Sequence, residues 1–113
     1  IHVWDLALAH IKAVDKFDDV IAQEADPDTP YVVINLGTGK GVTVREMVDA
    51  FESVHGKSIP TIEKEPRPGD VAGAYANADK ARELLGWVAE QPIDKGIEDA
   101  LRWGEIRDDI LAY

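Results

Sequence analysis

Apolar side chains recur every three or four residues in three stretches of the chain, which is the spacing of one buried helix face. The first stretch begins at Asp5, a residue type that caps helices, and continues to about Gln23. The second begins at Thr43 and ends before Gly56, and the third begins near Pro92. The predicted faces consist of Leu6, Ala9, Ala13, Phe17, Val20 and Ile21 in the first helix, of Val44, Met47, Val48, Phe51 and Val54 in the second, and of Ile93, Ile97, Ala100 and Leu101 in the third.

Capping residues define the ends of these helices and predict a fourth helix. Thr43 and Glu46 have the spacing of a capping box, in which each residue bonds the backbone of the other. Asn77 is a cap candidate for a short helix that ends at Leu85, before Gly86. The last helix is expected to continue into the charged tail beyond Trp103. The pattern therefore predicts about four helices.

One segment reads as a buried strand. Tyr31–Leu36 is a near-continuous apolar run rich in β-branched residues, which is typical of a strand covered on both faces in a parallel sheet. Shorter extended segments are predicted at Ile1–Val3, Ile59–Lys64, Tyr75–Ala76 and Trp87–Val88. Helices and strands together indicate an α/β fold with a small mixed sheet. Because the chain opens on apolar residues without an initiating Met, we expect a piece of a longer protein.

Composition narrows the class of partner. The chain has 113 residues, which fits a single region spanning 1–113. It carries 22 acidic and 12 basic residues and a formal net charge of −10, which argues against nucleic acid and against an anionic membrane surface. It has no cysteine and hence no disulfide, which fits a cytoplasmic protein, and no apolar run near the ~20 residues of a membrane span.

The glycine-rich loop after the predicted strand is a weak candidate for a phosphate site. Gly37–Gly41 reads G-x-G-x-G, and Val42 stands where the dinucleotide fingerprint has its third glycine. The default interpretation is a tight connection between a strand and a helix. A further interpretation is that the helix start, above all Val44, forms a wall for a ligand held elsewhere.

Catalytic groups are scarce. No Tyr-x-x-x-Lys occurs, since Asp79 stands four residues after Tyr75 and Asn35 four residues after Tyr31. The histidines His2, His10 and His55 have no metal-site spacing. We therefore predict no catalytic, cofactor-binding or metal-binding residue in this chain, which favours a binding region over a self-sufficient enzyme.

The turn Glu65–Asp70 is the best candidate for ligand contact. Two prolines and Gly69 give it a defined shape, and it presents Arg67 and Asp70 three positions apart. A guanidinium matches a phosphate, and a carboxylate accepts from a sugar hydroxyl. The alternative is a plain surface turn in which Arg67 and Asp70 pair with each other.

Several stretches, in this order, resemble a known family over essentially the whole chain. The stretches are Ile1–Ala7, Asn35–Val44, Arg67–Asp70, Tyr75–Asn77, Lys80–Ala81 and Leu85–Trp87. Together they resemble the C-terminal portion of the UDP-glucose 4-epimerase (UDP-galactose 4-epimerase) family, within the extended short-chain dehydrogenases/reductases.

The resemblance implies a C-terminal substrate-binding lobe of an NAD(P)-binding Rossmann-like enzyme. In the family, a Rossmann domain that is absent here binds NAD and carries the catalytic residues, and the enzyme interconverts UDP-glucose and UDP-galactose through a 4-keto intermediate. The C-terminal region holds the UDP. By resemblance, Arg67 contacts the diphosphate, Asp70 lies at the ribose, and Val44 lies against the nucleotide.

The sequence also departs from the family pattern. Pro66 stands where the family often has a second arginine, which leaves the phosphate role to Arg67. Ala74 falls at the position that borders the sugar, where a small residue implies room for an N-acetylated sugar.

Three interpretations follow. The first is the UDP-sugar-binding region of an epimerase, inactive alone, binding UDP weakly, and forming homodimers through apolar surface left uncovered. The second is the equivalent lobe of another nucleotide-sugar dehydratase, decarboxylase or epimerase. The third is a non-catalytic interaction module. An upstream reading frame without G-x-x-G-x-x-G and Tyr-x-x-x-Lys would exclude the first.

Overall fold

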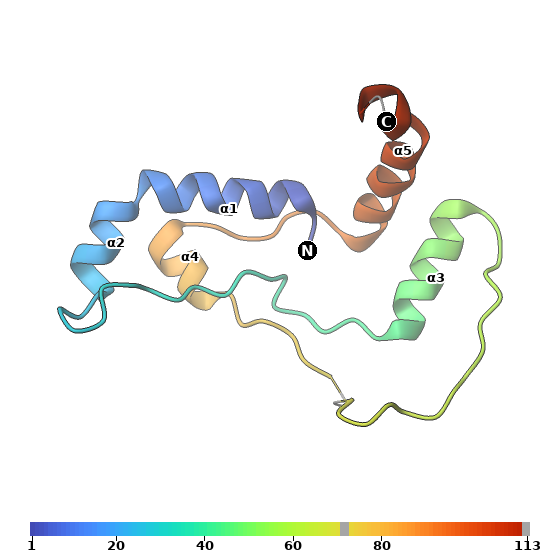
Figure 1. Cartoon of the computed structure of the whole chain (residues 1–113), viewed down its shortest axis with the longest axis horizontal. Helices are drawn as coiled ribbons and strands as arrows, with labels where there is room; N and C mark the ends of the chain where they lie inside the picture. Colours follow the sequence, from blue (N-terminus) through green and yellow to red (C-terminus); the bar gives the residue numbers. More distant parts are fainter. Residues whose placement is uncertain (71–72, 112–113) are drawn as a thin grey trace. The chain divides into compact units, whose positions relative to one another are not determined.

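The computed structural model describes residues 1–70 and 73–111, and this part of the chain contains five helices (Figure 1). It divides into two compact units, each built from two stretches of sequence. Unit 1 consists of Ile1–Lys40 and Tyr75–Gln91, and unit 2 of Gly41–Ala74 and Pro92–Tyr113. The helices are α1 (Val3–Asp15), α2 (Phe17–Glu24), α3 (Val44–His55), α4 (Asp79–Leu85) and α5 (Ile93–Leu111).

The first predicted helix is two helices that meet at Lys16. Lys16 has φ −106° and ψ 11°, which is not a helical conformation, so α1 ends and α2 begins there. The start also differs from the prediction. His2 is the N-cap, and its ring nitrogen accepts from the Trp4 N–H at 3.0 Å. The predictions of a strand at Ile1–Val3 and of Asp5 as the cap are therefore wrong, because the His2 side chain satisfies the helix start three residues earlier.

The core of unit 1 forms where α1 meets α4. Ala9 is 1% exposed and Ala81 is not exposed at all, and such small side chains let two helix backbones approach closely. Trp87, which follows α4, is 2% exposed and is the largest fully buried side chain. Val20, Ala78 and Leu85 complete the buried cluster. The ammonium group of Lys12 donates to the Gly86 carbonyl at 2.9 Å, where a cation complements the C-terminal end of α4.

Asp5 joins α1 to the segment that follows Trp87. Its carboxylate accepts from the backbone N–H of Glu90 at 3.2 Å and of Gln91 at 3.0 Å. Its carbonyl oxygen accepts from the Trp87 indole N–H at 2.9 Å. Asp5 is 2% exposed, so its carboxylate has almost no contact with water. The two backbone N–H groups take the place of the lost water as hydrogen-bond donors. The residue is a structural junction, and sequence reasoning did not find it.

The predicted small mixed sheet is not present in the part of the chain that the structure describes. Residues 31–36 alternate between exposed and half-buried side chains, with Val32, Ile34 and Leu36 packed against the core of unit 1. Tyr31 and Val33 on the other side are 66% and 67% exposed. The period of two is that of a strand, but a strand also needs a hydrogen-bonded neighbour. Among the described residues none is available, and the segments at 59–64, 75–76 and 87–88 also form no ladder.

The described part of unit 2 consists of α3, α5 and the irregular stretches of residues 56–70 and 73–74 (Figure 1). Helices α3 and α5 pack against each other through half-buried faces that include Val48, Phe51, Ile97 and Leu101. None of the described residues of unit 2 is buried. The half-buried side chains Val48, Phe51 and Val54 lie on the face of α3 that the sequence predicts. Met47, near the start of this face, is 47% exposed.

Helix ends follow the local signals in most cases. Gly56 and Gly86 end α3 and α4 in the left-handed conformation, with φ of 75° and 60°. The Asn77 side chain accepts from the Asp79 N–H at 2.7 Å, one residue before the formal N-cap of α4. Helix α5 begins at Ile93 and continues through the charged tail to Leu111, while residues 112–113 lie outside the described part.

Gly37 permits a close approach within unit 1, which gives a test of the fold. A Cβ at this position would lie 2.8 Å from the Ala76 Cβ, a distance that real side chains do not tolerate. We expect Gly37→Ala to destabilise the chain by about 1–3 kcal/mol, measured by urea unfolding followed by circular dichroism.

Gly104→Ala is the matched control. Gly104 lies within α5, and a Cβ added there would have nothing within 4 Å, so we expect this methyl group to stabilise by about 0.5–1 kcal/mol. Equal effects of the two substitutions would contradict the close contact between Gly37 and Ala76.

Candidate functional site

The start of α3 is fixed by a complete capping box. The Thr43 hydroxyl oxygen accepts from the Glu46 N–H at 3.2 Å, and the Glu46 carboxylate accepts from the Thr43 N–H at 2.7 Å. The Thr43 hydroxyl also donates to the same carboxylate at 2.7 Å. The bond from the Thr43 backbone, and then that from its hydroxyl, lowers the pKa of Glu46. The predicted cap is confirmed, and it fixes the backbone that carries Val44.

The segment after α3 runs back along that helix. The Ile59 N–H donates to the Glu52 carboxylate at 2.6 Å, near the end of α3. Four residues later, the Glu63 carboxylate pairs with Arg45 at 3.4 Å, in the first turn of α3. These two contacts lead the chain toward the start of α3 before the Glu65–Asp70 turn begins. The role of Arg45 could have been suspected only from the opposite charges at 45 and 63.

The Arg67–Asp70 turn is closed by one backbone–backbone hydrogen bond and one bond from the backbone to a side chain. The Asp70 N–H donates to the Arg67 carbonyl at 3.0 Å, and the Asp70 Oδ2 accepts from the Arg67 N–H at 2.9 Å. Pro68 occupies the second position of the turn, and Gly69, with φ 91°, occupies the third. Proline followed by a residue with positive φ is the pattern of a type II turn. The predicted shaped turn is therefore present.

The two charged side chains of this turn face each other. The Arg67 guanidinium lies 3.5 Å from the Asp70 Oδ1, and the side chains are 87% and 42% exposed. Exposed pairs of this kind contribute little to stability, so a ligand can displace one at small cost. The pairing expected of a plain surface turn is present, and it leaves a ligand-binding role possible.

The other two predicted contact residues are exposed. Val44, the first residue of α3, is 83% exposed, and Ala74 is also exposed. Neither contributes a polar contact to the Arg67–Asp70 pair. An apolar face at Val44 and a small side chain at Ala74 are what the predicted roles require, but those roles stay predictions.

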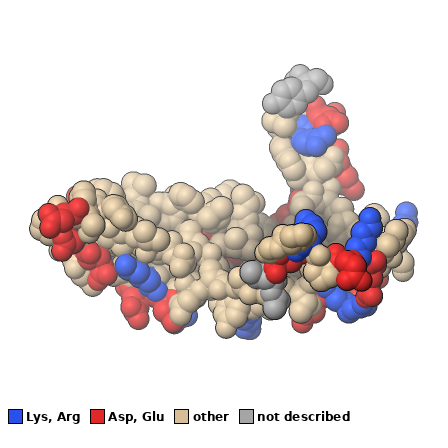
Figure 2. Space-filling view, turned by 60° about the horizontal axis from the view of Figure 1, so that its bottom comes forward, with Lys and Arg blue, Asp and Glu red and all other residues tan. Residues whose placement is uncertain are grey.

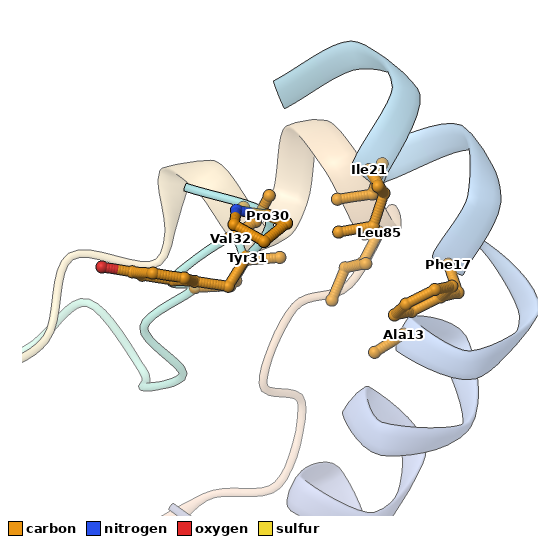
Figure 3. A pocket seen from close by; sticks show the side chains of 9 residues that line it. Ala13, Phe17, Ile21, Pro30, Tyr31, Val32 and Leu85 are labelled. Carbon is orange, nitrogen blue, oxygen red and sulfur yellow. The ribbon is translucent and has the colours of Figure 1, made fainter. Parts of the chain in front are cut away.

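The structure also contains an apolar pocket of about 240 Å³ in unit 1 (Figure 3). Figure 3 shows the Tyr31 hydroxyl directed away from Phe17 and Leu85, so the polar end of this side chain does not enter the pocket. No charged residue lines the pocket, which makes it unsuitable for a diphosphate. Its lining consists of Ala13, Phe17, Val20, Ile21, Pro30, Tyr31, Val32, Ile34 and Leu85.

Other kinds of site find no support in the part of the chain that the structure describes. No group of three or more His, Cys, Asp or Glu side chains is placed to hold a metal ion there. No helix within residues 1–70 and 73–111 is long and apolar enough to cross a membrane. On the face drawn in Figure 2, uncharged residues form a broad area over unit 1. The turn therefore remains the best candidate for binding an anion.

Comparison with known proteins finds UDP-glucose 4-epimerases both among similar sequences and among similar structures. UDP-glucose 4-epimerase of Drosophila melanogaster is 45% identical over 103 residues, which are 91% of this chain and 28% of that protein. The Bacillus subtilis enzyme of the same name is 42% identical over 103 residues, with the same coverage. A crystal structure of UDP-glucose 4-epimerase from Bifidobacterium longum, in complex with NAD+ and UDP, matches 93% of this chain and 29% of its own, with 41% identity and a TM-score of 0.76. No protein-family model matches the chain.

Over nine-tenths of its length, the chain is similar to the C-terminal part of UDP-glucose 4-epimerases. The resemblance expected from the sequence is confirmed. The chain spans 28% of the length of the epimerases from Drosophila melanogaster and Bacillus subtilis. The fold described above is also the fold of a region in an epimerase crystallised with NAD+ and UDP.

The capping box predicts a pH dependence at the start of α3. Because the pKa of Glu46 in the folded chain lies below its ordinary value of 4.5, the stabilisation is fully present above pH 4.5 and is lost as the pH falls through the lowered value. We expect the amide signals of Thr43 and Glu46 to report this loss in an NMR titration. Glu46→Gln keeps an oxygen acceptor but does not titrate, so the same acid transition in that variant would contradict the assignment.

Proposed function

We propose that this chain is the UDP-binding region of an NAD-dependent UDP-glucose 4-epimerase, which interconverts UDP-glucose and UDP-galactose. The observation that carries the proposal is the match to epimerases over more than nine-tenths of the chain, at 41–45% identity. The match favours an epimerase over a non-catalytic interaction module, since the relatives named above are all UDP-glucose 4-epimerases.

The chemistry available in this chain supports a binding role. Arg67 offers N–H donors in a planar fork, which suits the diphosphate. Asp70 offers carboxylate oxygens, which suit a ribose hydroxyl, and the exposed methyl groups of Val44 suit the face of the nucleotide. These residues bind and orient the ligand. The transfer of a hydride to and from NAD and the removal of the hydroxyl proton belong to residues outside this chain.

The glycine loop of this chain is poorly suited to binding NAD. The glycine loop has the wrong spacing for a dinucleotide, and a Cβ at Gly37 would meet Ala76 of the same unit. Its first glycine thus serves the packing of unit 1. We propose that NAD is held by the part of the enzyme that precedes this region.

The small side chain of Ala74 bears on which UDP-sugars the complete enzyme accepts. The resemblance implies that this position borders the sugar, where the exposed methyl group of Ala74 would leave room for an N-acetyl group. We propose that the complete enzyme accepts UDP-N-acetylglucosamine as well as UDP-glucose.

A chimeric enzyme tests the proposed function. The segment of the Bacillus subtilis epimerase that matches this chain is replaced by the chain, and epimerisation of UDP-glucose and UDP-N-acetylglucosamine is measured. We expect activity with both sugars. Arg67→Ala should raise KM by roughly tenfold or more, since hydrogen bonds between charged groups contribute about 1.5–3 kcal/mol.

Arg107→Ala is the matched control, because it removes an exposed arginine with an aspartate partner elsewhere in unit 2. We expect its KM to be unchanged. A folded chimera in which Arg67→Ala has no effect would exclude the proposed diphosphate contact. Activity with UDP-glucose alone would exclude the role of Ala74.

We also propose that the isolated chain forms homodimers. Helix α1 exposes large apolar side chains along much of its length, and an apolar surface of this extent is unusual for a soluble monomer. These residues are Val3, Trp4, Leu8, Ile11 and Val14, which are 48–76% exposed. Sedimentation velocity should show a dimer that dissociates on dilution. A compact monomer at high concentration would contradict this proposal.

A further inference from the structure

The last turns of α5 carry an exposed row of apolar side chains. Trp103, Ile106 and Ile110 follow the spacing of one helix face and are 43%, 40% and 59% exposed. At about 100° of rotation per residue, this face lies roughly opposite to Ile97 and Leu101, which belong to the face packed against α3. Figure 1 shows this end of α5 extending past α3. We call these three exposed residues the α5 seam.

Charged side chains border the α5 seam on both edges. Arg102 and Asp109 are separated by two helical turns, so they lie on the same edge, and both are exposed. Neither has an ion pair within the part of the chain that the structure describes. Arg107 lies on the other edge, where it pairs with its neighbour Asp108 at 2.9 Å. One edge thus carries two opposite charges, and the other edge carries a cation.

This order of charges distinguishes the two ways in which a second α5 could pack on the seam. In a parallel pair of helices, opposite edges face each other, so Arg102 meets Arg107 of the second copy and the two cations repel. In an antiparallel pair, like edges face each other, so Arg102 meets Asp109 of the second copy. Two-fold symmetry then forms this ion pair twice and places Ile106 against its own copy. The charges therefore complement a second, antiparallel copy of α5.

We propose that the α5 seam is a self-association surface that joins two copies of this chain through antiparallel α5 helices. The proposal uses no residue of the exposed face of α1 and none of the 67–70 turn, so its failure would leave the proposed function intact. The seam is short, because Asp99, one turn before Trp103, pairs with Lys95 at 2.8 Å. Small interfaces of this kind give weak association, so we expect a Kd of roughly 0.1–1 mM.

Single cysteines test the proposed geometry, since the natural chain has none. Ile106→Cys places two thiols at the two-fold axis, where oxidised glutathione takes up their hydrogens and electrons as the disulfide forms. Ile110→Cys is the matched control, because its two copies lie about 12 Å apart along the antiparallel helices, beyond the reach of a disulfide. We expect the fraction of disulfide-linked chains on a non-reducing gel to be roughly fivefold or more higher for Ile106→Cys.

The control separates this interface from its alternatives. Ile110 is more exposed than Ile106, so random collisions would favour cross-linking at residue 110. Cross-linking through residue 106 requires that two α5 helices meet, so association through α1 does not produce it. Equal cross-linking at both positions, whether from collisions or from a parallel pair, would overturn the proposal. The absence of cross-linking at both positions would overturn it as well.

Reversal of charge tests the orientation independently, in the Ile106→Cys chain. Arg102→Glu turns both attractive pairs into repulsive ones, so we expect the linked fraction to fall roughly three- to tenfold. Adding Asp109→Arg re-forms the pairs in reverse and should restore it. Arg107→Glu makes the same change in net charge on the other edge and should have no effect.

The expected pattern is therefore loss, rescue and no change, with the helix content of each variant checked by circular dichroism. Equal losses in Arg102→Glu and Arg107→Glu would mean that only net charge matters, and would overturn the proposal. A gain in either variant would indicate parallel helices and would also overturn it.

Discussion

The junction between Asp5 and the segment around Trp87 holds unit 1 together. A carboxylate and an indole N–H are both expensive to bury alone, and here each finds a backbone partner across more than eighty residues of sequence. The buried ring of Trp87 belongs to the same core cluster as Ala9 of α1 and Ala81 of α4. Three side chains of the apolar segment 31–36, those of Val32, Ile34 and Leu36, pack against this cluster.

The candidate site depends on a different kind of interaction. The turn at 67–70 and the start of α3 are shaped by contacts between residues three positions apart, and the segment between them is tied to α3 by Glu52 and Arg45. These contacts lie on the surface and use no buried side chain. The binding region is thus built from local geometry, whereas unit 1 is built from long-range packing.

This difference explains what could be predicted from the sequence. The capping box at Thr43, the end of α3 at Gly56 and the turn at Pro68–Gly69 were all predictable, because each depends on a few neighbouring residues. The sheet was not, because the apolar run at 31–36 favours an extended segment but does not specify the neighbouring strand that a sheet needs. The roles of Asp5 and Trp87 were missed for the same reason. The available signal is an acidic residue within the apolar start of the chain, and the same signal also fits a helix cap.

The absence of a buried side chain among the described residues of unit 2 has a consequence for its dynamics. Regions with few buried apolar contacts open locally at low free energy, so their amide hydrogens exchange with solvent sooner than those of a packed core. A ligand that needs the closed turn binds only the closed fraction of molecules, and its measured affinity is reduced by that fraction. Any protein surface that packed against α3 and α5 would raise the closed population, and would tighten ligand binding without touching the ligand.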